Sequence, residues 1–300
     1  MKLNKTKFDA MRKEKEKERD EKIALLGESL PVVADHEHRD ITCGKHGVYQ
    51  TRLVPDGPQE IIKTFRGEAP SKYREHTYCP ACKKELDDQC AAQLAEIDAM
   101  ERAEREEGRF RHLIDESGVS ARQAYVKLRE ITPVNQKQEQ AVAIANTIIE
   151  NLKSGEQAPN MIMSGSVGTG KTLIAAAAVQ SAIRSGLTAK ITTVMGVIRA
   201  FRATWKRDCE YSETDIIREL TTVDILVLDE VGVQYGSDSE KLFVFDVIDG
   251  RYRNMKPTIL ISNLNIDGIR ECIGDRCVDR MREDGGKVVA FDFESQRGKR

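Results

Sequence analysis

The sequence lacks any long apolar stretch, and its longest uninterrupted apolar run, 173–179, is far shorter than the roughly 20 residues that cross a bilayer. The basic N-terminus is not followed by an apolar segment, so we expect neither a secretory signal nor membrane attachment. The seven cysteines are odd in number and unevenly spaced, which argues against a disulfide framework. We therefore expect a soluble, cytoplasmic protein.

A charge excess of one sign is also missing. Lys and Arg number 47 against 49 Asp and Glu, which gives a formal net charge of −2. Such a balance excludes a basic field over the whole molecule, so any surface for nucleic acid must be a local patch. Hydrophobic residues make up 40% of the 300 positions, which is enough for a packed core and suggests two domains or one domain with an appendage.

Composition divides the chain into four segments. We expect a charged N-terminal helix or arm at 1–38, a zinc-ribbon-like module at 39–90, a helical connector at 91–120 and an α/β domain at 121–300. Residues 7–26 are dense in Lys, Arg and Glu, which predicts a solvated helix, either a docking arm for a partner or a helix without a specific role. A second charged helix is expected at about 83–113, interrupted at Gly108.

Two short pairs of metal-ligand residues stand out in the second segment. Cys43 and His46 form one pair and Cys79 and Cys82 the other, and both have the spacing at which one tight turn presents two ligands. Together they predict a structural Zn²⁺ site that supplies much of the folding free energy of a segment with little core. Unliganded thiols remain the alternative, and a redox pair is disfavoured because no βαβ pattern surrounds it. The rival ligands are His36, His38, His76 and Cys90.

From about residue 135 onward, apolar strands alternate with helices. Asn135 is expected to cap a helix that ends at Gly155. The predicted strands are 160–164, 190–194, 225–229, 258–262 and 288–293. The predicted helices between them are 172–185, 195–209, 238–254 and 267–282. This alternation indicates a parallel sheet with helices on both faces.

The most informative segment is Gly165-Ser166-Val167-Gly168-Thr169-Gly170-Lys171-Thr172, which satisfies the phosphate-binding pattern GxxxxGK[ST]. An apolar strand precedes it and an alanine-rich helix follows it, as the motif requires. Glycines allow the backbone to direct several N–H groups inward, and the start of the helix adds its positive dipole end. We therefore expect a polyphosphate such as that of ATP or ADP to bind here.

Hydrolysis needs further groups, and the later strands end in suitable ones. Asp229 and Glu230 end an apolar strand, so Asp229 is expected to hold Mg²⁺ and Glu230 to deprotonate the attacking water. Asn263 follows another apolar strand and can help to position that water. Arg276 and Arg280 are four residues apart on a predicted helix, where either could reach the γ-phosphate held by a neighbouring copy. The alternative for the acidic pair is that it only caps a strand, and the alternative for Asn263 is an ordinary asparagine in a turn. For the two arginines, the alternative is a solvated basic helix end.

These residues together resemble the AAA+ ATPases of the DnaC helicase-loader type, with a weaker likeness to phage and prophage versions that carry a zinc module. The resemblance covers about 120–297 and is carried by 165–172, 228–234, 262–265, 274–281 and 291–297. It implies a three-layer αβα P-loop fold, with Lys171 and Thr172 on phosphate and Mg²⁺. It also implies that Asp229 and Glu230 are the metal and water residues, Asn263 the first sensor, and Arg280 the finger in trans with Arg276 as its companion.

The same resemblance implies a function: weak ATP hydrolysis, binding of the replicative helicase and its placement on single-stranded DNA. Trp205 lies where members of the family carry an aromatic that meets single-stranded DNA, although a core position is equally compatible with the sequence. Few residues follow Arg280, so we expect no helical lid and therefore ATP-dependent assembly into a ring or spiral. The alternatives are an IstB-like transposition helper that binds double-stranded DNA and a zinc-ribbon nucleic-acid adaptor.

Overall fold

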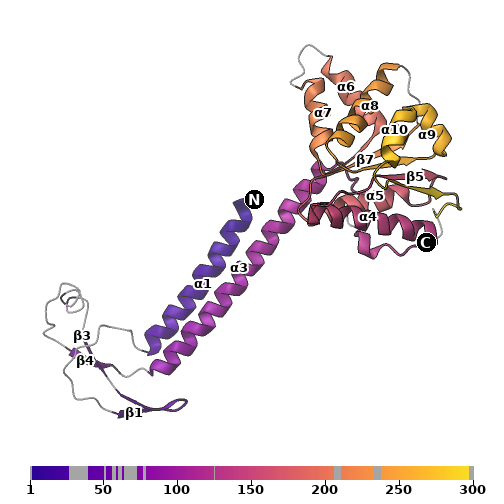
Figure 1. Cartoon of the computed structure of the whole chain (residues 1–300). Coiled ribbons are helices and arrows are strands. Elements are labelled where there is room, and N and C mark those ends of the chain that lie inside the picture. The colour runs from indigo at the N-terminus through magenta and orange to yellow at the C-terminus, as the bar shows by residue number, and fades with distance from the viewer. Residues whose placement is uncertain are drawn as a thin grey trace. The chain divides into compact units, whose positions relative to one another are not determined.

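The computed structural model describes residues 2–26, 40–50, 52–55, 59, 63, 73–76, 79–124, 126–205, 211–232 and 238–296. The chain forms two compact units, Met1–Gly108 and Arg109–Arg300 (Figure 1). The boundary between them, after Gly108, falls within a single helix.

The first unit is built on two long helices, α1 (Lys2–Leu26) and α3 (Pro80–Glu116). They lie side by side in Figure 1 and run antiparallel, because Arg12 pairs with Asp98 at 2.7 Å whereas Arg19 pairs with Asp87 at 2.9 Å. Phe8, on α1, is only 4% exposed, so α1 is not solvated on all sides. The predicted interruption at Gly108 is wrong: α3 continues to Glu116, since one glycine costs a long helix only about 1 kcal/mol.

Two antiparallel strand pairs lie between these helices in the sequence. The strand β1 (Asp40–Cys43) pairs with β2 (Gly47–Gln50), and β3 (Arg52–Pro55) pairs with β4 (Tyr73–His76). Gly47 has a φ of +78°, which the turn between β1 and β2 requires and which glycine adopts at no steric cost.

The second unit contains a five-stranded sheet with the order β6-β7-β8-β5-β9, in which all pairs are parallel. The strands are β5 (Met161–Gly165), β6 (Ala189–Thr193), β7 (Ile225–Val231), β8 (Thr258–Ser262) and β9 (Lys287–Phe291). All five lie where the sequence predicts them, to within two residues at each end. Near-continuous apolar runs of this kind suit strands that are buried on both faces.

Helices cover both faces of this sheet (Figure 1). On one face, α4 (Gln136–Ser154) and α5 (Lys171–Arg184) share a core with strand residues such as Met161 and Val227, and the short helix η1 (Leu128–Glu130) joins it through Leu128. The opposite face packs on Ile162 and Leu228. Its helices are α6 (Val194–Thr204), α7 (Glu213–Thr222), α8 (Asp238–Arg253), α9 (Ile266–Ile273) and α10 (Asp275–Arg282). The predicted α/β class is confirmed.

The helices differ from prediction at two places. The predicted helix 195–209 ends at Thr204, residues 206–210 lie outside the described part, and α7 follows, which sequence reasoning missed. The predicted helix 267–282 is divided into α9 and α10 at Gly274, whose φ of +87° cannot continue a helix. None of the helices in the described part combines the length and apolar character needed to cross a membrane.

Candidate nucleotide site and metal cluster

The phosphate-binding segment forms a tight loop between the end of β5 and the start of α5. Gly165, Gly168 and Gly170 have φ values of +115°, +77° and +93°, which residues other than glycine rarely adopt. At Gly165 a Cβ atom would also lie 2.5 Å from the carbonyl oxygen of Phe291 on β9. The pattern of glycines therefore reflects both backbone conformation and close packing.

Three hydrogen bonds anchor this loop to distant parts of the chain. The Ser166 N–H donates to the carbonyl of Phe291 at 2.9 Å, and the Gln296 N–H donates to the carbonyl of Gly168 at 2.8 Å. The Gln138 side chain, in the first turn of α4, donates to the carbonyl of Thr169 at 2.9 Å. Gln138 was not identified from the sequence, because a buried polar residue in an amphipathic helix does not reveal its distant partner. The loop is thus held in shape by α4, β9 and the segment after β9.

Lys171 lies almost fully inside this loop, with 5% of its surface exposed. Its ammonium group donates to the carbonyls of Gly165 at 2.7 Å and Ser166 at 2.6 Å. Burial lowers the pKa of Lys171, and the charge of Asp229 partly opposes this shift. The ammonium group therefore lies inside the loop, where two backbone carbonyls hold it. Phosphate oxygens bound at this place would be stronger acceptors than these carbonyls.

The strand β7 brings the acidic pair to the loop. The Thr172 hydroxyl donates to Asp229 Oδ2 at 2.9 Å, and the Glu230 N–H donates to Asp229 Oδ1 at 2.7 Å. Hydroxyl and carboxylate oxygens are the donor set that Mg²⁺ prefers, so the residues present fit this ion. The structure thus joins two residues that are far apart in the sequence.

Glu230 has a backbone conformation that the sequence did not reveal. Its φ is +57°, and the pairing of β7 with β8 is irregular between Leu228 and Val231. A non-glycine residue in the left-handed region costs about 1–3 kcal/mol and is typical of functional positions. Asp229 is buried whereas Glu230 is exposed, so the two carboxylates differ in their access to water.

Asn263 follows directly after β8. Ser262 pairs with Val231, and its hydroxyl donates to the Val231 carbonyl at 2.6 Å. The carboxyl ends of β7 and β8 therefore lie at one edge of the sheet, and Asn263 is exposed there. Its placement is compatible with the water-positioning role, which stays a prediction.

The two predicted arginines occupy different environments on α10. Arg276 is exposed, and the described residues provide no hydrogen bond or ion pair to its side chain. Arg280 forms an ion pair with Asp249 of α8, and its guanidinium lies 5.0 Å and 5.4 Å from the ring centroids of Phe245 and Tyr252. These partners on α8 were not predicted. The finger role stays a prediction for both arginines.

Trp205 is a surface residue, with 62% of its surface exposed. It ends α6, its indole N–H donates to Glu213 at 2.7 Å, and its ring centroid lies 6.3 Å from that of Phe243. The alternative in which Trp205 belongs to the core is therefore wrong. Most of the ring is accessible, as stacking on a base would require, and a DNA contact stays a prediction.

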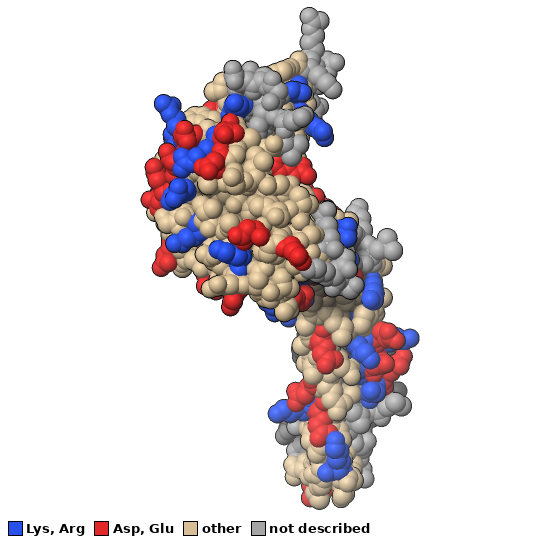
Figure 2. Space-filling model, turned by 90° about the vertical axis from the view of Figure 1, so that its right-hand side faces the viewer, with Lys and Arg blue, Asp and Glu red and all other residues tan. Residues whose placement is uncertain are grey.

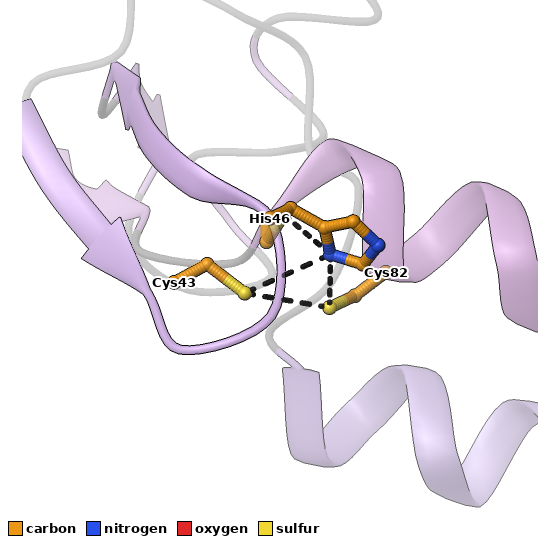
Figure 3. A group of neighbouring side chains, drawn as sticks. Cys43, His46 and Cys82 are labelled. Atoms are coloured by element: carbon orange, nitrogen blue, oxygen red, sulfur yellow. Dashed lines mark hydrogen bonds between the residues drawn. The ribbon is translucent and has the colours of Figure 1, made fainter.

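In the first unit, the four predicted zinc ligands converge. Figure 3 shows three of them, Cys43, His46 and Cys82. His46 Nδ1 lies 3.2 Å, 3.6 Å and 3.8 Å from the sulfurs of Cys82, Cys79 and Cys43. The sulfurs of Cys43 and Cys82 are 3.7 Å apart, close to the edge of about 3.8 Å that tetrahedral Zn²⁺–S bonds of about 2.3 Å produce. The donor set and its spacing fit Zn²⁺, and all four ligand atoms lie within 4.8 Å of one another.

The rival ligands do not enter this group where the structure describes them. Cys90 is buried on α3, with its sulfur 3.9 Å from the Lys15 carbonyl. His36 and His38 lie outside the described residues, as does the side chain of His76. Of the described candidates, His46 supplies the nitrogen beside the three sulfurs, and its role as a zinc ligand stays a prediction.

Glu85 was not identified from the sequence and lies behind His46. One of its carboxylate oxygens is 2.8 Å from His46 Nε2, and the other contacts the Lys45 ammonium group. Glu85 follows Cys82 by one turn of α3, so both residues lie on one helix face. The carboxylate orients the imidazole with Nδ1 toward the sulfurs, an arrangement common around metal-bound histidine.

Comparison with known proteins identifies the family of the second unit. Residues 85–299 match the family described as IstB-like ATP binding protein. The chain belongs to this family. The match begins inside α3, so all four residues of the Cys/His cluster lie outside it. The IstB-like family is one of ATP-binding proteins, which agrees with the geometry of the loop and its acidic pair.

Individual relatives agree with this assignment. YdaV of Escherichia coli K12, itself uncharacterized, is 32% identical over 189 residues, which are 63% of this chain and 75% of YdaV. The replicative helicase loader DnaC of the same strain is 34% identical over 140 residues, or 47% of this chain. The chain spans little more than half of DnaC, 57% of its length. The crystal structure of a DnaC helicase loader matches with a TM-score of 0.50 at 20% identity, covering 57% of this chain and 99% of that one. The predicted resemblance to DnaC-type AAA+ ATPases is confirmed, and this structural likeness shows the fold.

Proposed function

We propose that the protein is a cytoplasmic, ATP-dependent helicase loader with weak ATPase activity, which binds a replicative helicase and places it on single-stranded DNA. The observation that carries this proposal is the Thr172–Asp229 contact, because it joins the phosphate-binding loop and the acidic strand into one site. The similarity to DnaC supports the choice of a loader among ATP-driven functions.

Each residue of the nucleotide site has a defined part in this function. Loop N–H groups and Lys171 would bind the phosphates, and the oxygens of Thr172 and Asp229 would hold Mg²⁺, which would neutralise charge on the phosphates. Glu230 accepts a proton from the attacking water, and Asn263 orients that water at the same sheet edge. These groups would bring nucleotide, metal and water together at one edge of the sheet.

Assembly into a ring or spiral follows from the arginines of α10. Among the described residues, neither arginine forms a hydrogen bond or an ion pair with the phosphate-binding loop of its own chain. A neighbouring copy that brings Arg280, with Arg276 one turn before it, to the γ-phosphate would complete the site. ATP would then stabilise the contact between subunits.

Contact with single-stranded DNA is assigned to Trp205 on α6. Arg199 and Arg202, six and three residues earlier, are exposed as well, so cationic groups accompany the indole on one side of the helix. Figure 2 shows both signs of charge interspersed over the face that it displays, which fits a local rather than a general attraction to DNA. Stacking supported by a few cations gives binding without sequence preference.

Co-purification tests the proposal. The tagged chain is incubated with lysate of its host with and without ATP, and bound proteins are identified, with Lys171→Ala as the matched control. Capture of a replicative helicase is expected. Capture of a transposase, with binding to duplex DNA instead, would favour an IstB-like transposition helper, the alternative supported by the family that matches this chain.

A parallel measurement tests the DNA contact. Fluorescence anisotropy with labelled oligothymidylate should show weaker binding for Trp205→Ala and near-normal binding for Trp205→Phe, because stacking needs a ring but not the indole N–H. Equal loss in both variants would contradict stacking as the cause.

A further inference from the structure

Arg280 is held in place by a small cluster on α8. Asp249 forms an ion pair with its Nη1 atom, which is buried and donates no hydrogen bond to the described residues. The rings of Phe245 and Tyr252 come one turn before and one turn after Asp249 in the helix. Asp249 is itself 9% exposed. A long, flexible side chain is thereby restricted to one orientation.

Only part of the guanidinium group is used by this cluster. The side chain of Arg280 retains 26% exposure although Nη1 is buried, so the accessible part includes other atoms. Nε and Nη2 have no hydrogen bond or ion pair with the residues that the structure describes. Phe245 also lines an open groove together with Ile273 and Gly274, so the cluster lies at the surface of the unit.

Asp249 contacts two guanidinium groups at once. Asp249 Oδ1 contacts Arg280, while Oδ2 lies 2.7 Å from Arg253, whose side chain is 71% exposed. One carboxylate therefore serves two guanidinium groups and cannot neutralise both. Asp249 fixes the position of Arg280, while part of the guanidinium group stays accessible to a partner.

We propose that Asp249 is a positioning residue, which holds Arg280 so that its remaining N–H groups can meet the triphosphate bound by a neighbouring copy of this chain. The inference rests on the proposed role of Arg280 in trans. An arginine that is already oriented loses less conformational entropy when it binds the phosphate in the transition state, so the contribution of Asp249 should appear in kcat.

ATP hydrolysis by the full-length protein with oligothymidylate tests this inference. For Asp249→Asn, kcat should fall about tenfold with the KM for ATP changed less than about twofold, and Asp249→Glu should recover part of the loss. Asp267→Asn is the matched control, because it makes the same change at an exposed position on α9, with no contact to Arg280 or Asp249 among the described residues. For Arg280→Ala, the loss should exceed about a hundredfold.

Mixing of subunits separates a role in trans from a structural one. Lys171→Ala subunits cannot bind ATP but retain an intact Arg280, which they can offer to ATP held by an Asp249→Asn subunit. The mixture should be more active than the sum of its separate components, whereas a mixture of Asp249→Asn with Arg280→Ala should show no such gain. A defect in the fold or nucleotide site of the Asp249→Asn subunit would not be relieved in this way.

The possible failures are distinguishable. Normal kcat for Asp249→Asn beside an inactive Arg280→Ala would overturn the positioning role and leave the proposed function intact. An Asp249→Asn subunit that Lys171→Ala does not rescue would show that Asp249 is structural. Full activity of Arg280→Ala would remove the role of this arginine in trans, and the inference with it.

Discussion

Replacement of Arg251 by lysine should destabilise the second unit strongly. Arg251 is fully buried, and its guanidinium donates to five acceptors: the carbonyls of Leu220, Val223, Asp224 and Pro257, and the hydroxyl of Thr258. These acceptors lie at the end of α7 and at the starts of β7 and β8. Because the same two strands end in the acidic pair and Asn263, Arg251 supports the site from the opposite edge of the sheet.

The magnitude follows from the number of donors. An ammonium group has three N–H donors, so lysine loses at least two of the five hydrogen bonds even in ideal geometry. At roughly 1.5 kcal/mol for each buried acceptor, the free energy of unfolding should fall by about 3 kcal/mol. With a slope of about 2 kcal/mol per M in urea, the midpoint of unfolding should shift by about 1.5 M.

Urea denaturation followed by circular dichroism measures this shift, and amide hydrogen exchange in β7 and β8 assigns it to the second unit. Arg253→Lys, two residues along α8, is the control, because an exposed ion pair contributes at most about 1 kcal/mol. A loss below about 1 kcal/mol for Arg251→Lys, at an unchanged slope, would refute the reasoning from unsatisfied acceptors.

Three further outcomes follow from the two sites. Lys171→Ala should abolish ATP binding measured by calorimetry while zinc content, measured by elemental analysis, stays unchanged; loss of both would indicate general misfolding. Glu85→Gln should weaken zinc binding about 10–100-fold in competition with a chelator, whereas Asp88→Asn, one turn further along α3, should have no effect, and equal losses would exclude a specific role for Glu85. Gly165→Ala should reduce ATP affinity, because its Cβ would lie 2.5 Å from the Phe291 carbonyl; unchanged affinity in calorimetry would show that the loop tolerates the displacement.

The phosphate-binding loop and the strands could be predicted because their signals are local. Each constrained position of the loop has a backbone or side-chain requirement that appears directly in the residue type, and continuous apolar runs predict strands buried on both faces. The Cys/His cluster was predictable for the same reason, since the spacing within each pair reflects one turn. The gap of 32 residues between the pairs was no obstacle, because both pairs are recognisable separately.

Features that depend on distant partners could not be predicted. Nothing near Arg280 in the sequence indicates Asp249, and nothing near Gln138 indicates the carbonyl of Thr169. The left-handed conformation of Glu230 arises from a register shift between two strands, which periodicity does not encode. The helix α7 did have a local signal, the capping box of Ser212 and Asp215, which the more polar composition around it obscured.

The tether from Gln296 to Gly168 gives the segment after β9 an influence on ligand affinity. If nucleotide binding favours the tethered arrangement of the loop, thermodynamic reciprocity requires that tethering favours nucleotide binding by the same free energy. A protease cut before Gln296, or a tag that disturbs this residue, would then increase the dissociation constant for ATP. Fusions for pull-down or imaging are therefore better attached at the other terminus.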